Sequence, residues 1–249
     1  MTFEIEKSGP PYLFRYRSNG EFTIDELENS YIYFSDRKEL NDPYDSIPNL
    51  INLTNDVEEL KNSYNLILEN INDSITKSYF TRKFSADNVK DLINESLEPF
   101  LNQFGIACFS INPLNLPLWA NYSNNNKGIC LQFNMDKDIN FFKNWRPVTY
   151  ETDLKQTIFN PSTNRSGIMD VFFRKSKLWN NEYEIRLVKQ KKGKIKFKKE
   201  ALANVILGYN IEPDYKDRII KTIEKNYSNT NIFQMKRPTE LKTISFTKI

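Results

Sequence analysis

The sequence predicts an α+β fold in which a mixed or antiparallel sheet carries a two-helix insertion. Short stretches that alternate apolar and polar residues, or run apolar between turn residues, lie before residue 54 and after residue 104 and are typical of strands. Between those positions apolar residues recur every three or four positions, as in amphipathic helices. The chain has 249 residues, of which 39% are hydrophobic and 14% aromatic. We therefore expect residues 1–249 to form a single α+β domain with a helical insertion at about 54–104.

The first strand is expected at residues 12–18, where Arg15 and Arg17 alternate with aromatic residues and so share one face. A second strand, residues 31–34, leads into a turn at 41–43, because proline fixes its own φ and disfavours helix in the residue before it.

In the insertion, the apolar positions predict two helices joined near residues 80–87. Further strands are expected at residues 105–110, 128–133, 146–152, 182–188, 204–210, 231–237 and 241–247. Helices are expected around Trp119 and Tyr122, at 168–179 and at 212–226, with a polar loop at 153–167 and a basic hairpin at 189–199.

Composition narrows the possible chemistry. The chain has no histidine, which excludes imidazole bases, Ser-His-Asp or Cys-His machinery and the usual zinc sites. Its two cysteines, Cys108 and Cys130, lie in apolar strand-like runs and are expected to be buried reduced thiols. The net charge of +3 does not by itself imply a nucleic-acid partner. No apolar run is long enough to span a membrane, so a cytoplasmic location without membrane partner is expected.

A pair of acidic residues is the first candidate site. Glu182, Glu184 and Arg186 alternate in a predicted strand and should share one face, with Tyr183 and the following apolar residues Ile185 and Leu187 in the core. Neighbouring carboxylates repel each other unless a cation, water or a hydrogen-bond donor compensates. We expect one of them to be held by Arg186 or a tyrosine hydroxyl and the other to face a cleft.

Six blocks of sequence, in order, resemble the bacterial family known as domain of unknown function 2971. They read LFRYRS, YFSDRKELNDPYD, GIACFSINPLNLPLWANYSNNNKGICLQF, VTY, KSKLWNNEYEIRLV and VILGYNI. Asn121, within LWANY, stands where that family often has a histidine, so any chemistry that used this histidine would be lost here.

More distantly, the order of a strand arginine, a strand serine and a late Glu-x-Glu resembles the Arg-Ser-Glu group of ADP-ribosyltransferases. The resemblance implies an ADP-ribosyltransferase-like sheet and NAD as co-substrate. It implies catalytic roles for Glu184, which would stabilise the ribosyl cation, and Glu182, which would orient the acceptor. Replacing Glu184 by glutamine should then abolish NAD cleavage with little change in the thermal midpoint.

The same resemblance implies which residues bind the cofactor: Arg15, Arg17, Ser110, Trp119 and Tyr122. Arg15 or Arg17 would hold the pyrophosphate and should lie near Glu184 on the same sheet face, while an aromatic ring would line the nicotinamide. The acceptor would be a protein or a nucleic acid. By analogy, the setting would be a bacterial toxin or phage-defence effector, with an antitoxin or defence-system partner.

Two other functions are open. Asp42, Asp45, Glu182 and Glu184 could gather around Mg²⁺ in a nuclease, with Lys175 nearby and the 189–199 hairpin holding phosphates. Alternatively, the protein is a binding module without catalysis. The simpler interpretations of these patterns are a solvated charge ladder, arginines that protect an edge strand, and core positions for the aromatic residues.

Overall fold

The computed structural model describes residues 11–85, 87–160, 167–237 and 244–249. It confirms an α+β fold. In the described part of the chain, eight strands form one mixed sheet in the order β14-β13-β12-β5-β1-β4-β10-β6, with β12 and β13 parallel and the other neighbours antiparallel. These strands are β1 (Tyr12–Arg17), β4 (Gly105–Ser110), β5 (Ile129–Asn134), β6 (Arg146–Pro147), β10 (Glu184–Lys189), β12 (Leu202–Leu207), β13 (Asn231–Met235) and β14 (Phe246–Lys248).

Smaller two-stranded sheets and short helices surround the main sheet. The small sheets pair β2 (Tyr31–Phe34) with β11 (Gly193–Lys196), β3 (Ile51–Leu53) with β8 (Thr157–Phe159), and β7 (Thr149–Glu151) with β9 (Arg174–Ser176). The α-helices are α1 (Glu21–Glu28), α2 (Val57–Glu69), α3 (Ser74–Lys83), α4 (Val89–Leu101), α5 (Leu116–Tyr122), α6 (Ile139–Phe142) and α7 (Pro213–Asn226). The 3₁₀ helices used below are η2 (Arg37–Glu39), η5 (Gly167–Phe173) and η6 (Lys177–Glu182).

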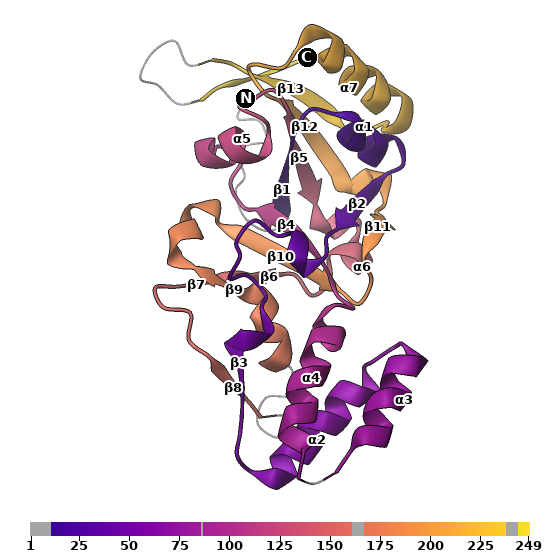
Figure 1. Cartoon of the computed structure of the whole chain (residues 1–249). Helices are drawn as coiled ribbons and strands as arrows, with labels where there is room; N and C mark the ends of the chain where they lie inside the picture. Colours follow the sequence, from indigo (N-terminus) through magenta and orange to yellow (C-terminus); the bar gives the residue numbers. More distant parts are fainter. Residues whose placement is uncertain (1–10, 86, 161–166, 238–243) are drawn as a thin grey trace.

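Both faces of the main sheet are covered. Helices α1 and α7 lie on one side and α5 on the other (Figure 1). The alternation of β1 follows this division, because Leu13 packs with the residues of α1 and α7, whereas Phe14 and Tyr16 pack with Trp119 of α5. A strand covered on both faces has no exposed face for its arginines. Arg15 is therefore buried and Arg17 is only partly exposed, and β1 lies in the middle of the sheet rather than at an edge.

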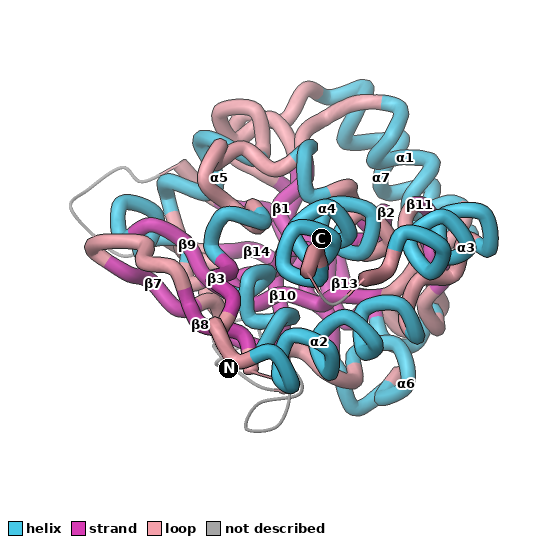
Figure 2. Tube along the Cα trace, turned by 60° about the horizontal axis from the view of Figure 1, so that its bottom comes forward, coloured by secondary structure: helices cyan, strands magenta, loops and turns pink. Residues whose placement is uncertain are grey.

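In its described residues the helical insertion contains three helices, so the prediction of two was wrong. Helix α2 ends at Glu69, and a new helix begins after Asp73, whose carboxylate accepts a hydrogen bond from the Thr76 amide at 2.7 Å. Ile75, expected on the buried face of the first helix, is 79% exposed. The three helices lie at the end of the molecule away from α7 and surround a second apolar cluster (Figures 1 and 2). None of the described helices is long and apolar enough to cross a membrane.

Four further expectations are corrected. Residues 168–179 form no α-helix: η5, β9 and η6 share this stretch, because β9 pairs in parallel with β7. The expected strand at 146–152 divides into β6 and β7, which belong to different sheets, and the polar loop contains β8. The basic stretch forms no hairpin with β10, because β11 pairs with β2 instead. Residues 161–166 and 238–243, parts of the expected loop and of the last strand, lie outside the described residues.

A split between β1 and β4 is the feature that positions the site. The two strands are paired only at Phe14 and Ser110, whereas β1 pairs with β5 over its full length. Beyond that point Ser35 replaces β1, since its backbone exchanges two 2.9 Å hydrogen bonds with Ile106 of β4. The two strands therefore diverge within the sheet, and a cavity opens between them.

Candidate functional site

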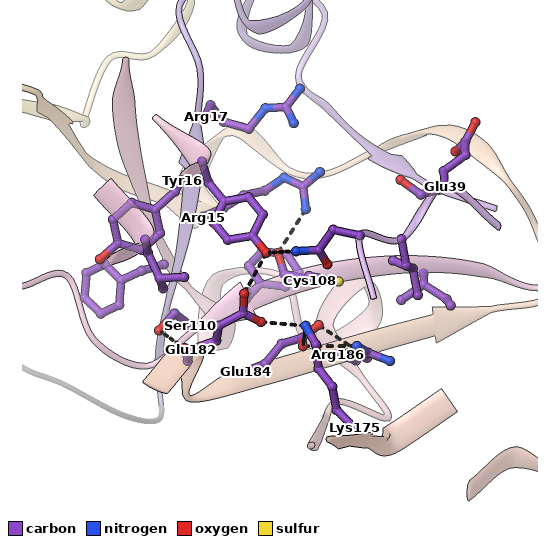
Figure 3. A pocket seen from close by; sticks show the side chains of 18 residues that line it. Arg15, Tyr16, Arg17, Glu39, Cys108, Ser110, Lys175, Glu182, Glu184 and Arg186 are labelled. Carbon is purple, nitrogen blue, oxygen red and sulfur yellow. Dashed lines mark hydrogen bonds and ion pairs between the residues drawn. The ribbon is translucent and has the colours of Figure 1, made fainter. Parts of the chain in front are cut away.

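The cavity at this split has a volume of about 240 Å³ (Figure 3). Its polar lining comprises Arg15, Tyr16, Arg17, Ser35, Glu39, Asn41, Cys108, Ser110, Tyr122, Lys175, Glu182, Glu184 and Arg186. Of the residues predicted for the transferase site, all except Trp119 line this cavity, whereas Asp42 and Asp45 of the nuclease hypothesis do not. The lining comes from several segments that are far apart in the sequence.

Strand register explains why these residues meet. Ser110 is the register partner of Phe14 on one side and of Glu184 on the other, so β1, β4 and β10 bring one residue each to the same level of the sheet. The Ser110 hydroxyl donates a 2.9 Å hydrogen bond to the Glu182 carbonyl. The predicted grouping of arginine, serine and glutamate is thus present in space.

Arg15 reaches the cavity from the opposite face of the sheet, so the prediction of a shared face was wrong. By alternation it lies on the side of α1, with its guanidinium 5.7 Å from the ring centre of Phe109. Its Nη1 donates to the carbonyl of Cys108 at 3.0 Å and its Nη2 to that of Tyr33 at 3.3 Å. Arg15 can reach the cavity because β1 and β4 are not paired beyond Phe14 and Ser110. Continued pairing of the two strands would have left no opening for its side chain.

The buried carboxylate of Glu26 forms ion pairs with both Arg15 and Arg17. Glu26 of α1 is 1% exposed and lies 3.5 Å from Nε of Arg15 and 2.6 Å from Nε of Arg17. Burial lowers the pKa of Arg15, and the charge of Glu26 opposes that effect. The three groups together carry a formal charge of +1, at one end of the cavity. Glu39, which also lines the cavity, is exposed and adds one negative charge.

The acidic pair is built differently from the predicted strand. Glu182 is the last residue of η6, and only Glu184 belongs to β10. Tyr183 between them has φ 48° and ψ 49°, a left-handed conformation that is uncommon for a bulky residue, and is 53% exposed. The expectation that Tyr183 packs in the core was wrong, whereas burial of Ile185 and Leu187 is confirmed.

Glu182 is held by two neighbours. The Tyr122 hydroxyl donates to Oε1 at 2.6 Å, and Nζ of Lys175 donates to Oε2 at 2.6 Å. Tyr122 in turn accepts a 2.7 Å hydrogen bond from the Asn41 side chain. Burial raises the pKa of Tyr122, and its hydrogen bond to Glu182 raises it further, so the hydroxyl stays a donor.

Glu184 is paired with cations on both oxygens. Arg186 donates from Nε to Oε1 at 2.6 Å and from Nη2 to Oε2 at 3.0 Å, and Lys175 Nζ lies 3.3 Å from Oε2. Burial alone would raise the pKa of Glu184, but the charge and hydrogen bonds of Arg186, with Lys175, lower it to about 2. Arg186 holds Glu184, the Tyr122 hydroxyl holds Glu182, and both carboxylates line the cavity, so the expectation that only one would be held was wrong.

Lys175 joins the two carboxylates. It is buried in β9, where burial would lower its pKa, but Glu184 and Glu182 together raise it. Its ammonium group also lies 4.7 Å from the ring centre of Trp179. Arg186 continues the network to Asp45, the remaining acid of the cluster. Asp45, Glu182 and Glu184 with Lys175 and Arg186 carry a formal charge of −1, opposite in sign to the arginine end.

The hydrogen bonds of these carboxylates also test the nuclease hypothesis, which requires them to bind Mg²⁺. Asp45 and Glu184 both accept from Arg186, and one oxygen of Asp42 accepts from the Tyr44 amide at 2.9 Å. Among the described residues, no group of three or more acidic, cysteine or histidine side chains is arranged to hold a metal ion. The four predicted carboxylates therefore do not form a metal-binding group in this part of the chain.

Trp119 does not line the cavity. It is completely buried, its Nε1 donates to the Pro113 carbonyl at 2.9 Å, and its ring meets Tyr16 edge to face. Tyr122, three residues on, is the aromatic side chain of α5 that faces the cavity. Both cysteines are free thiols, as predicted. The predicted burial is confirmed for Cys130, whereas Cys108 is partly exposed and lines the cavity.

Three residues that contact the candidate site were not predicted from the sequence. Glu26 and Asn41 gave no signal, because their partners are remote in sequence. Tyr150 of β7 accepts a 2.9 Å hydrogen bond from the Glu184 amide and so fixes the start of β10. Within VTY the only available signal was an aromatic residue in a short strand-like run.

Comparison with known proteins adds one finding. Residues 118–187 match the model of a family described as "Protein of unknown function (DUF2971)". The match confirms the predicted resemblance to that family over this segment, which runs from α5 into β10 and carries Tyr122, Lys175 and the acidic pair. No curated protein and no solved structure matches the chain.

Proposed function

We propose that this chain is an ADP-ribosyltransferase-like enzyme that uses NAD as co-substrate. The observation that carries the proposal is the separation of formal charge within one cavity. Its arginine end, Arg15 and Arg17 with Glu26, is net positive. Its acidic end is net negative and comprises Glu182, Glu184 and Asp45 with Lys175 and Arg186. NAD has the complementary arrangement, a negative pyrophosphate next to a ribose that carries the cationic nicotinamide ring.

The cavity size supports binding of part of the dinucleotide. Its 240 Å³ lies just below the range of about 300–1,000 Å³ that is typical of pockets for drug-sized ligands. The nicotinamide ribose would occupy the acidic end beside Tyr122, and the pyrophosphate would contact Arg15 and Arg17. The adenosine would then lie outside the enclosed volume.

The chemistry assigns a role to each end. The bond between ribose C1′ and the nicotinamide nitrogen breaks, and its electron pair neutralises the nicotinamide ring. The ribosyl cation that develops is stabilised by Glu184 and by the net charge of the acidic cluster. An acceptor heteroatom then bonds to C1′, and its proton passes to Glu182 and on to solvent. The products are the ADP-ribosylated acceptor, neutral nicotinamide and one proton.

The test is the release of nicotinamide from NAD by the purified protein, followed by chromatography. Glu184→Gln removes one charge from the acidic end, so we expect nicotinamide release to fall by at least about 100-fold. Glu98→Gln is the matched control, since Glu98 also holds two cations, Arg37 and Lys38, but does not line the cavity. Variants are compared only where their circular dichroism matches that of wild type. Equal activity of the Glu184 and Glu98 variants would contradict the proposal.

The biological setting is part of the proposal only by analogy. A toxin or phage-defence effector, an antitoxin partner and a cytoplasmic location are all compatible with a small transferase of this kind. They stay predictions based on the sequence.

A further inference from the structure

A dense group of lysines lies outside the cavity. Residues 189–199 contain seven lysines and no acidic residue, whereas the rest of the chain has 28 basic and 32 acidic residues. We call this stretch the lysine segment. All of its lysines except Lys189 are exposed. The small net charge of the protein therefore hides a strong local concentration of positive charge.

Few of these charges are neutralised. Lys192 pairs with Asp36 and Lys194 with Asp25, each at 2.6 Å. The remaining exposed lysines, which are Lys191, Lys196, Lys198 and Lys199, form no ion pair with any carboxylate in the described parts of the chain. A lysine or two would be enough to protect the outer edge of β11 from pairing with another chain. Seven lysines exceed that need.

The lysine segment also has an aromatic neighbour and a connection to the cavity. Lys194 lies directly across from Tyr33 in the β2–β11 pair, so the two side chains share a face, and Tyr33 is exposed. The carbonyl of Tyr33 accepts the hydrogen bond from Arg15, and Ser35, two residues on, lines the cavity. The surface and the cavity are thus built on the same strand.

We propose that the lysine segment and Tyr33 bind single-stranded nucleic acid and present it to the cavity. Lysines recognise the phosphate backbone, and an exposed tyrosine ring offers a platform on which an unpaired base can stack. The two lysines of β11, Lys194 and Lys196, alternate along the strand and so lie about 6.6 Å apart on one face. An acidic protein or an anionic membrane surface would neutralise the lysines, but neither offers an unpaired base to stack on the ring.

This inference adds an acceptor, single-stranded nucleic acid, to the proposed function. The acceptor role depends on the proposed transferase activity. Binding itself does not require NAD. It is measured with the full-length protein and a fluorescent single-stranded oligonucleotide of mixed sequence, by anisotropy at several salt concentrations. If four lysines contact phosphates, the logarithm of the binding constant should fall with the logarithm of salt concentration with a slope of about −3.

Paired variants test the location. Lys191→Gln with Lys196→Gln removes two unpaired charges of the lysine segment and should reduce the slope by about 1.4 and the affinity at 0.1 M salt about 25-fold. Lys61→Gln with Lys77→Gln makes the same change of net charge on exposed positions of α2 and α3 and should leave binding within about twofold. Equal losses in the two double variants would overturn the proposed location.

A substitution of Tyr33 tests whether the surface prefers single-stranded nucleic acid to other polyanions. Tyr33→Ala should weaken single-strand binding about tenfold and leave the weaker duplex binding unchanged, because only unpaired bases can stack on the ring. Tyr79→Ala, on the exposed side of α3, is the control and should change neither. Absence of binding at 20 mM salt, tighter binding to duplex, or tighter binding to vesicles of anionic lipid would each overturn the proposal.

The two proposals can fail separately. Oligonucleotide binding without NAD cleavage would support the lysine segment as a nucleic-acid surface and contradict the transferase. Nicotinamide release with no oligonucleotide binding would contradict the lysine segment alone. If both hold, radiolabelled NAD should transfer its label to the single strand and not to the protein.

Discussion

The guanidinium of Arg186 and the carboxylate of Asp45 form a completely buried, two-pronged ion pair between residues 141 positions apart. Arg186 lies in β10, next to Glu184, and Asp45 lies in the loop that follows η2. The same loop supplies Asn41, which bonds to Tyr122. This pair therefore fixes one wall of the cavity to the strand that carries the acidic end.

Breaking that pair should be costly. Asp45→Asn leaves the buried charge of Arg186 with less compensation, and we expect the free energy of unfolding to fall by about 3–5 kcal/mol. Glu151→Gln is the control, because Glu151 makes a similar two-pronged pair with Arg174 at 2.7 Å but is partly exposed, and it should cost about 1 kcal/mol. Urea unfolding measures both. Similar losses would show that burial does not set the strength of the Arg186 pair.

Acid should destabilise the protein through Glu184. Its pKa is about 2 in the folded state and about 4.3 when unfolded, so its contribution is complete above about pH 5 and is lost as the pH falls towards 2. The difference of about 2.3 pKa units corresponds to about 3 kcal/mol. Urea unfolding of wild type and Glu184→Gln between pH 6 and pH 2.5 should show the two stabilities converging. Parallel curves would contradict the lowered pKa.

Burial also changes the expectation for Glu184→Gln itself. The sequence predicted little change in the thermal midpoint. Because Glu184 accepts hydrogen bonds from two buried cations, Arg186 and Lys175, the variant should instead lose about 3–5 kcal/mol of stability at pH 7. The melting temperature should fall by several degrees, and an unchanged midpoint would support the original expectation.

Tyr122→Phe tests whether the orientation of Glu182 matters, and it removes no charge, unlike Glu184→Gln. The ring remains, but Glu182 loses the hydroxyl that holds Oε1, so the kcat for NAD cleavage should fall about 10-fold to 100-fold while KM changes less than about threefold. Tyr64→Phe removes a comparable 2.6 Å hydrogen bond, to the Phe80 carbonyl in the helical insertion, and should keep kcat. A rise in KM with unchanged kcat would show that Tyr122 contributes only to binding.

The sequence predicted elements whose pattern is local. Alternation located β1, β4 and β10, and periodicity located most of the helical insertion. It did not predict the break near Asp73, because a side-chain cap outweighed the apolar period that continued to Ile75. It did not predict β9 either, where pairing with a remote strand outweighed a helix-like stretch.

The site was predicted in its residues more than in its geometry. Arg15, Ser110 and Glu184 meet as expected, but Arg15 arrives from the opposite face, which only the split between β1 and β4 permits. The partners of the acidic pair, Lys175 and Tyr122, come from other elements and are fixed by tertiary packing. Trp119 and Tyr122 could not be distinguished in the sequence, since both are aromatic residues of the same short helix. In the structure Trp119 packs in the core, whereas Tyr122, about one turn later, lines the cavity.

The most direct measurement is a single incubation of wild-type protein with NAD, single-stranded oligonucleotide and Mg²⁺, sampled with and without a chelator. The account predicts release of nicotinamide at the same rate in both samples, with the oligonucleotide uncut. NAD that stays intact while the oligonucleotide is cleaved only in the presence of Mg²⁺ would contradict it.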